Sequence, residues 1–277
     1  MAADGITGNL SERACKVLRT ADPLAKAAAG RRLASDWRDG TVTTICAEIG
    51  GAGSTSPPGR PARPERPELR PPREMPRRRL SGSRGRIALL HAIAHIELNA
   101  IDLAWDLIAR FAHAGLPRAF FDDWVGVAAD EGRHFILLSD RLAELEAAYG
   151  DLPAHDGLWQ AAEDTAHDLA ARLAVVPMVL EARGLDVTPA MVAKLQRAGD
   201  EPSAALLQLI LDEEIGHVAA GRRWFEWLCQ RDGVEPTSRW RALVASHFKG
   251  ALKPPFNHEA RNQAGMTAKY YHSVNLC

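Results

Sequence analysis

From residue 85 onward, apolar side chains recur every three to four positions over long stretches, which is the pattern of amphipathic helices. Together with the Gly and Pro interruptions, the pattern predicts four long helices and one short one: 86–114, 118–149, 156–184, 189–198 (the short one) and 202–231. Long helices joined by short connections are typical of a helical bundle. We therefore predict an all-α protein built around a four-helix bundle at residues 85–232.

The segments around this bundle have a different pattern. Residues 1–56 predict one or two short helices within 9–36, interrupted near Asp22-Pro23, and then a loop. The tail, 233–277, predicts one helix (RWRALVASHF) and an irregular, proline-containing end. The protein is therefore expected to consist of a bundle with an N-terminal helical segment, a connecting arm and a C-terminal extension.

The connecting arm, residues 57–84, contains eight prolines and nine arginines against three glutamates. Such a sequence favours an extended chain over a helix. A basic arm of this kind can bind nucleic acid. We favour a strap that is packed across the bundle, with its arginines paired to acids of the first two long helices.

Composition narrows the class of protein. Lys and Arg number 34 against 35 Asp and Glu, a formal net charge of −1, which argues against a dedicated nucleic-acid binder. The four cysteines are far apart and form no CxxC pair, so neither a thiolate metal site nor a disulfide scaffold is expected. The N-terminus lacks an apolar signal region, and the most apolar stretch, 87–108, carries six polar or charged side chains. We therefore expect a cytoplasmic protein that does not span a membrane.

Two of the predicted helices carry the same tetrapeptide, Glu-x-x-His. It occurs as Glu131-Gly-Arg-His134 and as Glu214-Ile-Gly-His217. Side chains three positions apart leave the same face of a helix. Because the flanking residues on that face are apolar, these glutamates are expected in the core, where an ionised carboxylate needs a cation or an ion-pair partner.

The other two long helices each place one glutamate on an otherwise apolar face, Glu97 and Glu181. The interval from Glu97 to Glu131 is 34 residues and that from Glu181 to Glu214 is 33, so the chain repeats a unit. A glutamate from each of two helices and Glu-x-x-His from the other two is the ligand set of carboxylate-bridged dinuclear metal sites in four-helix bundles. Four carboxylates would balance two divalent cations, and mixed carboxylate and imidazole ligands suit iron or manganese.

The predicted metal ligands are Glu97, Glu131, His134, Glu181, Glu214 and His217. The alternative is four unrelated buried glutamates held by arginines. Glu213 is an alternative to Glu214. Asp102 and Asn99 are candidates to support ligands in the first long helix, and Asp130 and Asp212 hold equivalent places before the two motifs. His91 and His95 lie on other faces of the helix, and we expect them to pack against the arm. No tyrosine is expected beside a ligand, because Tyr149 ends the second predicted helix.

Several stretches resemble a known family. HAIAHIELNAIDLAWDL, DDWVGVAADEGRHF, LPAHDGLW, VPMVLEARGLDVTP and LDEEIGHVAAGRRWF are similar to the bacterial ferritin-like family called domain of unknown function 455, and PARPERPELRPPREMPRR is similar to the segment before its bundle. The resemblance covers roughly residues 10–265 but not the end, MTAKYYHSVNLC. It implies a ferritin-like fold in which the six residues above match the expected metal ligands, and it implies no particular reaction.

These observations favour a non-haem di-iron oxidoreductase, with Mn/Fe as an alternative metal pair. Glu97, Glu131 and His134 would bind one ion, and Glu181, Glu214 and His217 the other. The expected partners are O2, a small-molecule substrate that is hydroxylated or dehydrogenated, and an external electron donor; a homodimer is a candidate assembly. Two alternatives are kept. One is a tRNA-modifying hydroxylase, which is supported only by the basic arm. The other is a non-catalytic iron-storage or scaffold protein.

Overall fold

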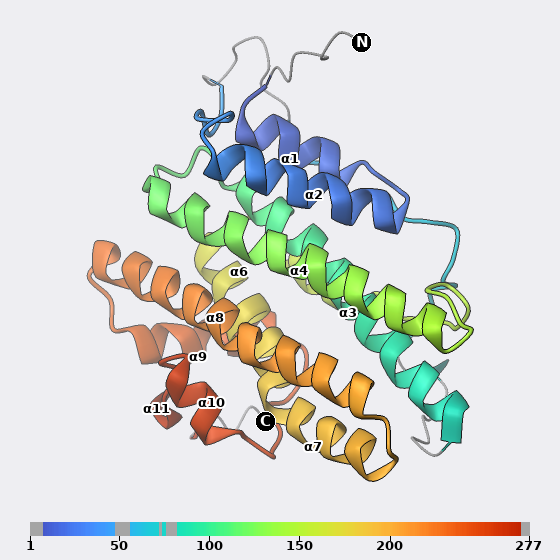
Figure 1. The fold of residues 1–277 in the computed structure, drawn as a ribbon. Coiled ribbons are helices and arrows are strands. Elements are labelled where there is room, and N and C mark those ends of the chain that lie inside the picture. The colour runs from blue at the N-terminus through green and yellow to red at the C-terminus, as the bar shows by residue number, and fades with distance from the viewer. Residues whose placement is uncertain (1–7, 48–55, 72–73, 76–81, 273–277) are drawn as a thin grey trace, which may run out of the picture. The chain divides into compact units, whose positions relative to one another are not determined.

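The computed structural model describes residues 8–47, 56–71, 74–75 and 82–272, and its regular elements there are helices (Figure 1). The elements are α1 (Leu10–Leu18), α2 (Pro23–Arg38), α3 (Gly82–Arg110), α4 (Arg118–Glu144), α5 (Gly157–Asp164), α6 (Leu169–Val175), the π-helix η2 (Val176–Glu181), α7 (Ala182–Arg197), α8 (Glu201–Asp232), α9 (Pro236–His247), α10 (His258–Gln263) and α11 (Ala268–Tyr271). The predicted all-α class is confirmed.

The chain divides into two compact units. The first comprises Met1–Glu68, His91–Asp140 and Ala148–Ala154, and the second comprises Leu69–Leu90, Arg141–Ala147 and His155–Cys277. Most of α3 and α4 therefore belongs to the first unit with α1 and α2, whereas α5 to α11 belong to the second. The four-helix bundle and the four segment boundaries expected from the sequence stay predictions.

The two N-terminal helices begin where the sequence predicts. The side chain of Asn9 accepts a hydrogen bond from the backbone N–H of Glu12, and Glu12 accepts one from Asn9, so α1 starts with a capping box. Asp22 caps α2 through the N–H of Ala25, and Pro23 occupies the first turn, where its missing N–H costs nothing. The predicted interruption near Asp22-Pro23 is confirmed.

In the first unit, α2 packs closely against both α3 and α4. A Cβ atom added to Gly132 of α4 would lie only 3.2 Å from the carbonyl oxygen of Ala27 in α2, so the close approach of the two backbones requires glycine there. On the α3 side, Lys26 Nζ lies 2.6 Å from Asp102 Oδ1, and both side chains are buried. This buried ion pair joins α2 to α3.

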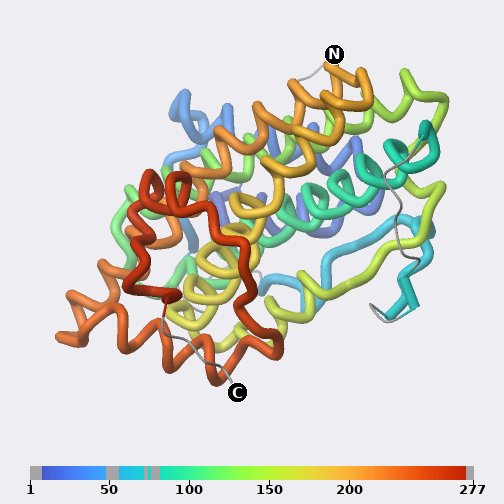
Figure 2. The backbone as a smooth tube through the Cα atoms, turned by 90° about the horizontal axis from the view of Figure 1, so that it is seen from below, coloured from blue at the N-terminus to red at the C-terminus, as the bar shows by residue number. Residues whose placement is uncertain are grey.

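In residues 56–68 the arm forms no helix and contacts α1 and α3, whereas the predicted strap across a four-helix bundle stays a prediction. Its Ala62 N–H donates to the carbonyl of Leu18 at 2.8 Å, and Arg63 lies 3.1 Å from Asp102 and 2.7 Å from Asn99. Figure 2 shows this segment beside residues 148–154, to which the carbonyl of Glu68 is bonded. Arg63 is therefore engaged with α3. Residues 72–73 and 76–81 of the predicted arm lie outside the described residues, and α3 already begins at Gly82.

The single helix expected at 156–184 is wrong. The chain forms α5, a turn, α6 and η2 over this stretch. Asp168 ends the turn and caps α6, accepting hydrogen bonds from the N–H groups of Ala170 and Ala171. Pro177 then removes one helical N–H, and the helix widens into a π-helix. Trp240 of α9 donates its indole N–H to the carbonyl of Ala174 at this irregularity.

The short helix expected at 189–198, after an end at Gly184, is also wrong, because α7 runs from Ala182 to Arg197 with Pro189 inside it. Pro189 cannot donate the bond that the carbonyl of Leu185 would receive in a regular helix. The side-chain amide of Asn257 donates to that carbonyl instead, at 3.1 Å. A residue from the C-terminal segment thus replaces the hydrogen bond that the proline removes.

Other helix ends differ modestly from the predictions. The first long helix spans 82–110 rather than 86–114, and α4 ends at Glu144 rather than at 149. The tail contains α10 and α11 after α9, where an irregular chain was expected. The helix α8 agrees within one residue at each end and stops at Gly233, which has φ 69°.

The helix α3 has the length and hydropathy of a membrane span, with a mean hydropathy of 1.4 in its most apolar window. However, 83% of that window is buried in the structure. This burial is consistent with the core helix of a water-soluble protein.

Candidate metal centre

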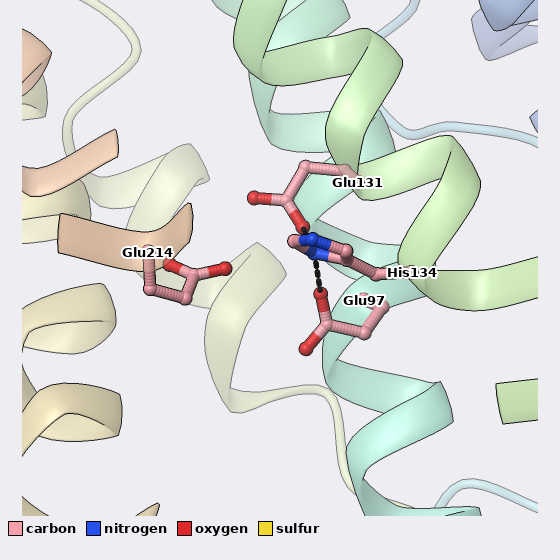
Figure 3. A group of neighbouring side chains, drawn as sticks. All are labelled: Glu97, Glu131, His134 and Glu214. Atoms are coloured by element: carbon pink, nitrogen blue, oxygen red, sulfur yellow. Dashed lines mark hydrogen bonds and ion pairs between the residues drawn. The ribbon is translucent and has the colours of Figure 1, made fainter. Parts of the chain in front are cut away.

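The first unit brings three of the six predicted ligands together. Glu97 comes from α3, whereas Glu131 and His134 come from α4, one turn apart. Nδ1 of His134 lies 3.2 Å from Oε2 of Glu97 and 3.6 Å from Oε2 of Glu131 (Figure 3). Each side chain offers one ligand atom, and these atoms lie within 4.8 Å of one another. The sequence pattern thus predicted a real spatial cluster.

The cluster is buried, and two of its three members are acids. The exposed fractions of Glu97, Glu131 and His134 are 4%, 1% and 0%. Burial alone would lower the pKa of His134, but its contacts with Glu131 and Glu97 outweigh burial and raise the pKa to about 11. With this raised pKa, His134 is expected to be protonated at neutral pH and to donate from Nδ1 to the neighbouring carboxyl groups.

These residues fit a metal ion. Two carboxylates and an imidazole are ligands of iron, manganese and other divalent cations. In the metal-free protein the proton on Nδ1 provides positive charge at the position between the two acids where a metal ion would bind. Exchanging that proton for a divalent cation would neutralise both carboxylates. This buried cluster of Glu97, Glu131 and His134 could therefore hold a metal ion.

The second unit contains the other half of the predicted ligand set. Oε1 of Glu214 lies 3.3 Å from Nδ1 of His217, and His217 is buried. This contact supports Glu214 over Glu213. Glu181 is the last residue of η2 and is half-buried. Among the described residues, Glu181 and His217 are in no group of three ligand-type side chains as tight as the first cluster, and their role as ligands stays a prediction.

The sequence of this chain matches a known protein family. The model of the family described as "Protein of unknown function (DUF455)" matches residues 19–272. The chain belongs to this family. It is 41% identical over 201 residues to a Haemophilus influenzae protein (strain ATCC 51907 / DSM 11121 / KW20 / Rd) described as "Uncharacterized protein", an alignment that covers 71% of this chain and 70% of that protein. No solved structure matches.

All six predicted ligands of this DUF455 protein lie inside the matched region. Two residues considered as supports for the ligands have another role. Asp102 pairs with Lys26 and Arg63, and Asn99 accepts from Arg63 and donates to the carbonyl of His95. They fasten the arm and α2 to α3. Asp130 pairs with Arg133, and Asp212 accepts a bond from Gln208.

An aromatic contact between the 148–154 segment and the helices α3 and α4 was missed. Tyr149 lies beyond the end of α4, yet its ring stacks on His91 and His95 and meets Phe135, the neighbour of His134, edge-on. Its hydroxyl is 2.9 Å from Nδ1 of His95, and burial raises the pKa of Tyr149. His91 accepts a hydrogen bond from the N–H of Gly150 and His95 bonds to Tyr149, and the expected packing of both histidines against the arm stays a prediction. Only the fold of 148–154 places this tyrosine, so helical periodicity carries no signal for it.

Proposed function

We propose that this DUF455 protein is a dinuclear non-haem iron carboxylate protein with a ferritin-like bundle, and that it uses O2 to oxidise a small-molecule substrate. Glu97, Glu131 and His134 would hold one ion, and Glu181, Glu214 and His217 the other. Glu131 and Glu214 are the candidates to bridge. The proposal requires the two units to bring these halves together.

The observation that carries the proposal is the buried cluster in the first unit. Two carboxyl groups and an imidazole from two different helices converge in the core, where buried acids are costly unless a cation or hydrogen bonds compensate them. This combination of side chains is a ligand set that a divalent cation can use.

The repeated spacing of 34 and 33 residues supports a second ion. The motif Glu214-x-x-His217 repeats the contact of Glu131 with His134, at 3.3 Å and 3.6 Å. In four-helix bundles this duplicated set binds two metals. The absence of cysteine from both motifs favours iron or manganese over structural zinc.

The residues of the chain would balance the charge of the bound metal ions and keep bulk water away from them. Bound iron would supply the redox chemistry through which O2 oxidises a substrate. The four carboxylates would neutralise two divalent cations, so the buried site would need no further counter-ion. Burial of Glu97, Glu131 and His134 excludes bulk water and suppresses side reactions.

The proposal is tested with protein purified and loaded with Fe(II) without oxygen. We expect exposure to O2 to consume the gas and to produce a near-ultraviolet absorption band. Glu131→Ala should abolish both signals, whereas Glu201→Gln, an exposed glutamate in the first turn of α8, should retain them. Equal O2 consumption by the two variants would refute the role of Glu131.

A further inference from the structure

The second unit contains a cavity that is separate from the predicted ligands. Its volume is about 160 Å³, and it lies between η2 and α7 on one side and the C-terminal segment 248–261 on the other. In Figure 2 this red segment runs along the yellow helices of the same unit. Lys253, one of the residues that line the cavity, is exposed to solvent.

One wall of the cavity is apolar. Phe248, Leu252 and Phe256 line it from the C-terminal segment, and Val179 and Leu180 line it from η2. All but Val179 are only half-buried, so their apolar surface is within reach of a ligand. A cavity of about 150 Å³ lined by apolar side chains holds one benzene molecule. The apolar wall therefore fits a body of that size.

The other end of the cavity is positively charged. Asp186 is the one acid among the lining residues. The buried Arg261 donates hydrogen bonds to both carboxylate oxygens of Asp186, at 2.8 and 2.7 Å. Arg183 donates to the carbonyls of Lys253 and Pro255 at 2.6 and 3.0 Å, and its Nη1 lies 3.5 Å from Oδ2 of Asp186. Its contacts with described residues all use Nη1, so Nε and Nη2 remain for a ligand. Arg183 and Lys253 leave a net positive charge.

We propose that this cavity binds a small carboxylic acid with an apolar body about the size of a benzene ring. The apolar body would lie against Phe248, Leu252 and Phe256, and the carboxylate would pair with Arg183. The guanidinium fork matches a carboxylate in shape and charge, and such charge-assisted bonds are stronger than neutral ones. This site goes beyond the proposed metal function, and it does not depend on bound metal.

The experiment is isothermal titration calorimetry of the full-length, metal-free protein with three probes. Benzoate has both the charge and the body, benzyl alcohol has the body alone, and acetate has the charge alone. We expect benzoate to bind at least about tenfold more tightly than either of the others, since benzyl alcohol lacks the charge-assisted pairing and acetate lacks the apolar body. Equal binding of benzoate and acetate, or no binding of benzoate, would overturn the proposal.

Variants locate the site. Arg183→Gln should weaken benzoate binding about tenfold or more, whereas Arg197→Gln, an exposed arginine in the last turn of the same helix, should leave it unchanged. Because Arg183 also holds residues 253–255, Leu252→Trp is a second variant, which fills the cavity and keeps the arginine. Benzoate binding that survives Leu252→Trp would show that the acid binds elsewhere.

Discussion

Nδ1 of His134 lies 3.2 Å from Oε2 of Glu97, so α3 and α4 are joined by a contact between two buried ionisable side chains. A metal ion that binds to Nδ1 must displace its proton, because the raised pKa of about 11 keeps His134 protonated at neutral pH. We expect Fe(II) or Mn(II) binding at pH 7 to release about one proton from this residue. Calorimetry in two buffers of different ionisation enthalpy measures the number of protons released per bound metal ion. The His134→Gln variant should not release this proton. An equal proton release in the variant would contradict the assignment of the proton to His134.

The same contact predicts how the stability of the metal-free protein depends on pH. The pKa of His134 is raised from 6.5 to about 11, so its stabilising effect is complete below about pH 6.5 and is lost as the pH rises toward about 11. We expect the difference in unfolding free energy between wild type and His134→Gln to shrink from pH 7 to pH 10. Urea unfolding of both metal-free proteins measures it. A difference that grows with pH would exclude this protonated contact.

The ion pair between Lys26 and Asp102 is expected to stabilise the protein, although Arg63 also lies 3.1 Å from Asp102. Burial lowers the pKa of Lys26 and raises that of Asp102, and the 2.6 Å contact offsets this cost. Because Arg63 still pairs with Asp102, we expect Lys26→Ala to destabilise the protein by less than the roughly 3–5 kcal/mol lost when a buried charge keeps no partner. The double variant Lys26→Met, Asp102→Leu should recover most of the loss, because it removes the buried carboxylate as well. Thermal unfolding of the wild type, Lys26→Ala and the double variant measures these losses of stability. A double variant that is even less stable than Lys26→Ala would argue against a stabilising interaction between Lys26 and Asp102.

The bond from Asn257 to the carbonyl of Leu185 should matter only while Pro189 is present. Asn257→Ser keeps an acceptor for the N–H of Ala260 but removes the amide that reaches Leu185. We expect a loss of about 1–2 kcal/mol in the wild type and a smaller loss in a Pro189→Ala background, where a helical N–H restores the bond. A double-mutant cycle measures the coupling, which should vanish if the two residues act independently.

Close packing of α8 on η2 predicts opposite effects for two glycines. A Cβ atom on Gly221 would lie 2.4 Å from the ring of Pro177, whereas nothing lies within 4 Å at Gly216. We expect Gly221→Ala to cost about 1–3 kcal/mol through overpacking. Gly216→Ala should stabilise by up to about 1 kcal/mol through helix propensity. Chemical unfolding measures the change in unfolding free energy for each variant. Equal changes for the two variants would show that α8 does not approach η2 so closely.

Local signals in the sequence predict much of this protein. The caps at Asn9 and Asp22 fix the starts of α1 and α2, and the prolines of the arm exclude a helix. The apolar faces of α3 and α4 place Glu97, Glu131 and His134 in the core, where the structure brings them together. Each of these features depends on neighbours in the sequence.

The features that sequence analysis missed depend on distant residues. Pro189 lies inside α7 because Asn257, 72 residues from Leu185, supplies the missing hydrogen bond. Local patterns indicate a helix break near Pro189 and cannot report compensation from elsewhere in the chain. The opposite error occurs around Pro177, where a continuous helix was expected and the chain forms a turn and a π-helix; there Trp240 bonds the carbonyl of Ala174 from 66 residues away. The position of Tyr149 is likewise set by tertiary contacts.

The central claim is that six side chains bind two metal ions. The most direct test is the metal content of protein purified without oxygen and equilibrated with Fe(II), measured by plasma mass spectrometry alongside Glu181→Ala and Glu201→Gln. We predict about two ions per chain in the wild type and in Glu201→Gln, and fewer in a folded Glu181→Ala. A wild type with no stoichiometric metal, or a Glu181→Ala variant that retains both ions, would contradict the account.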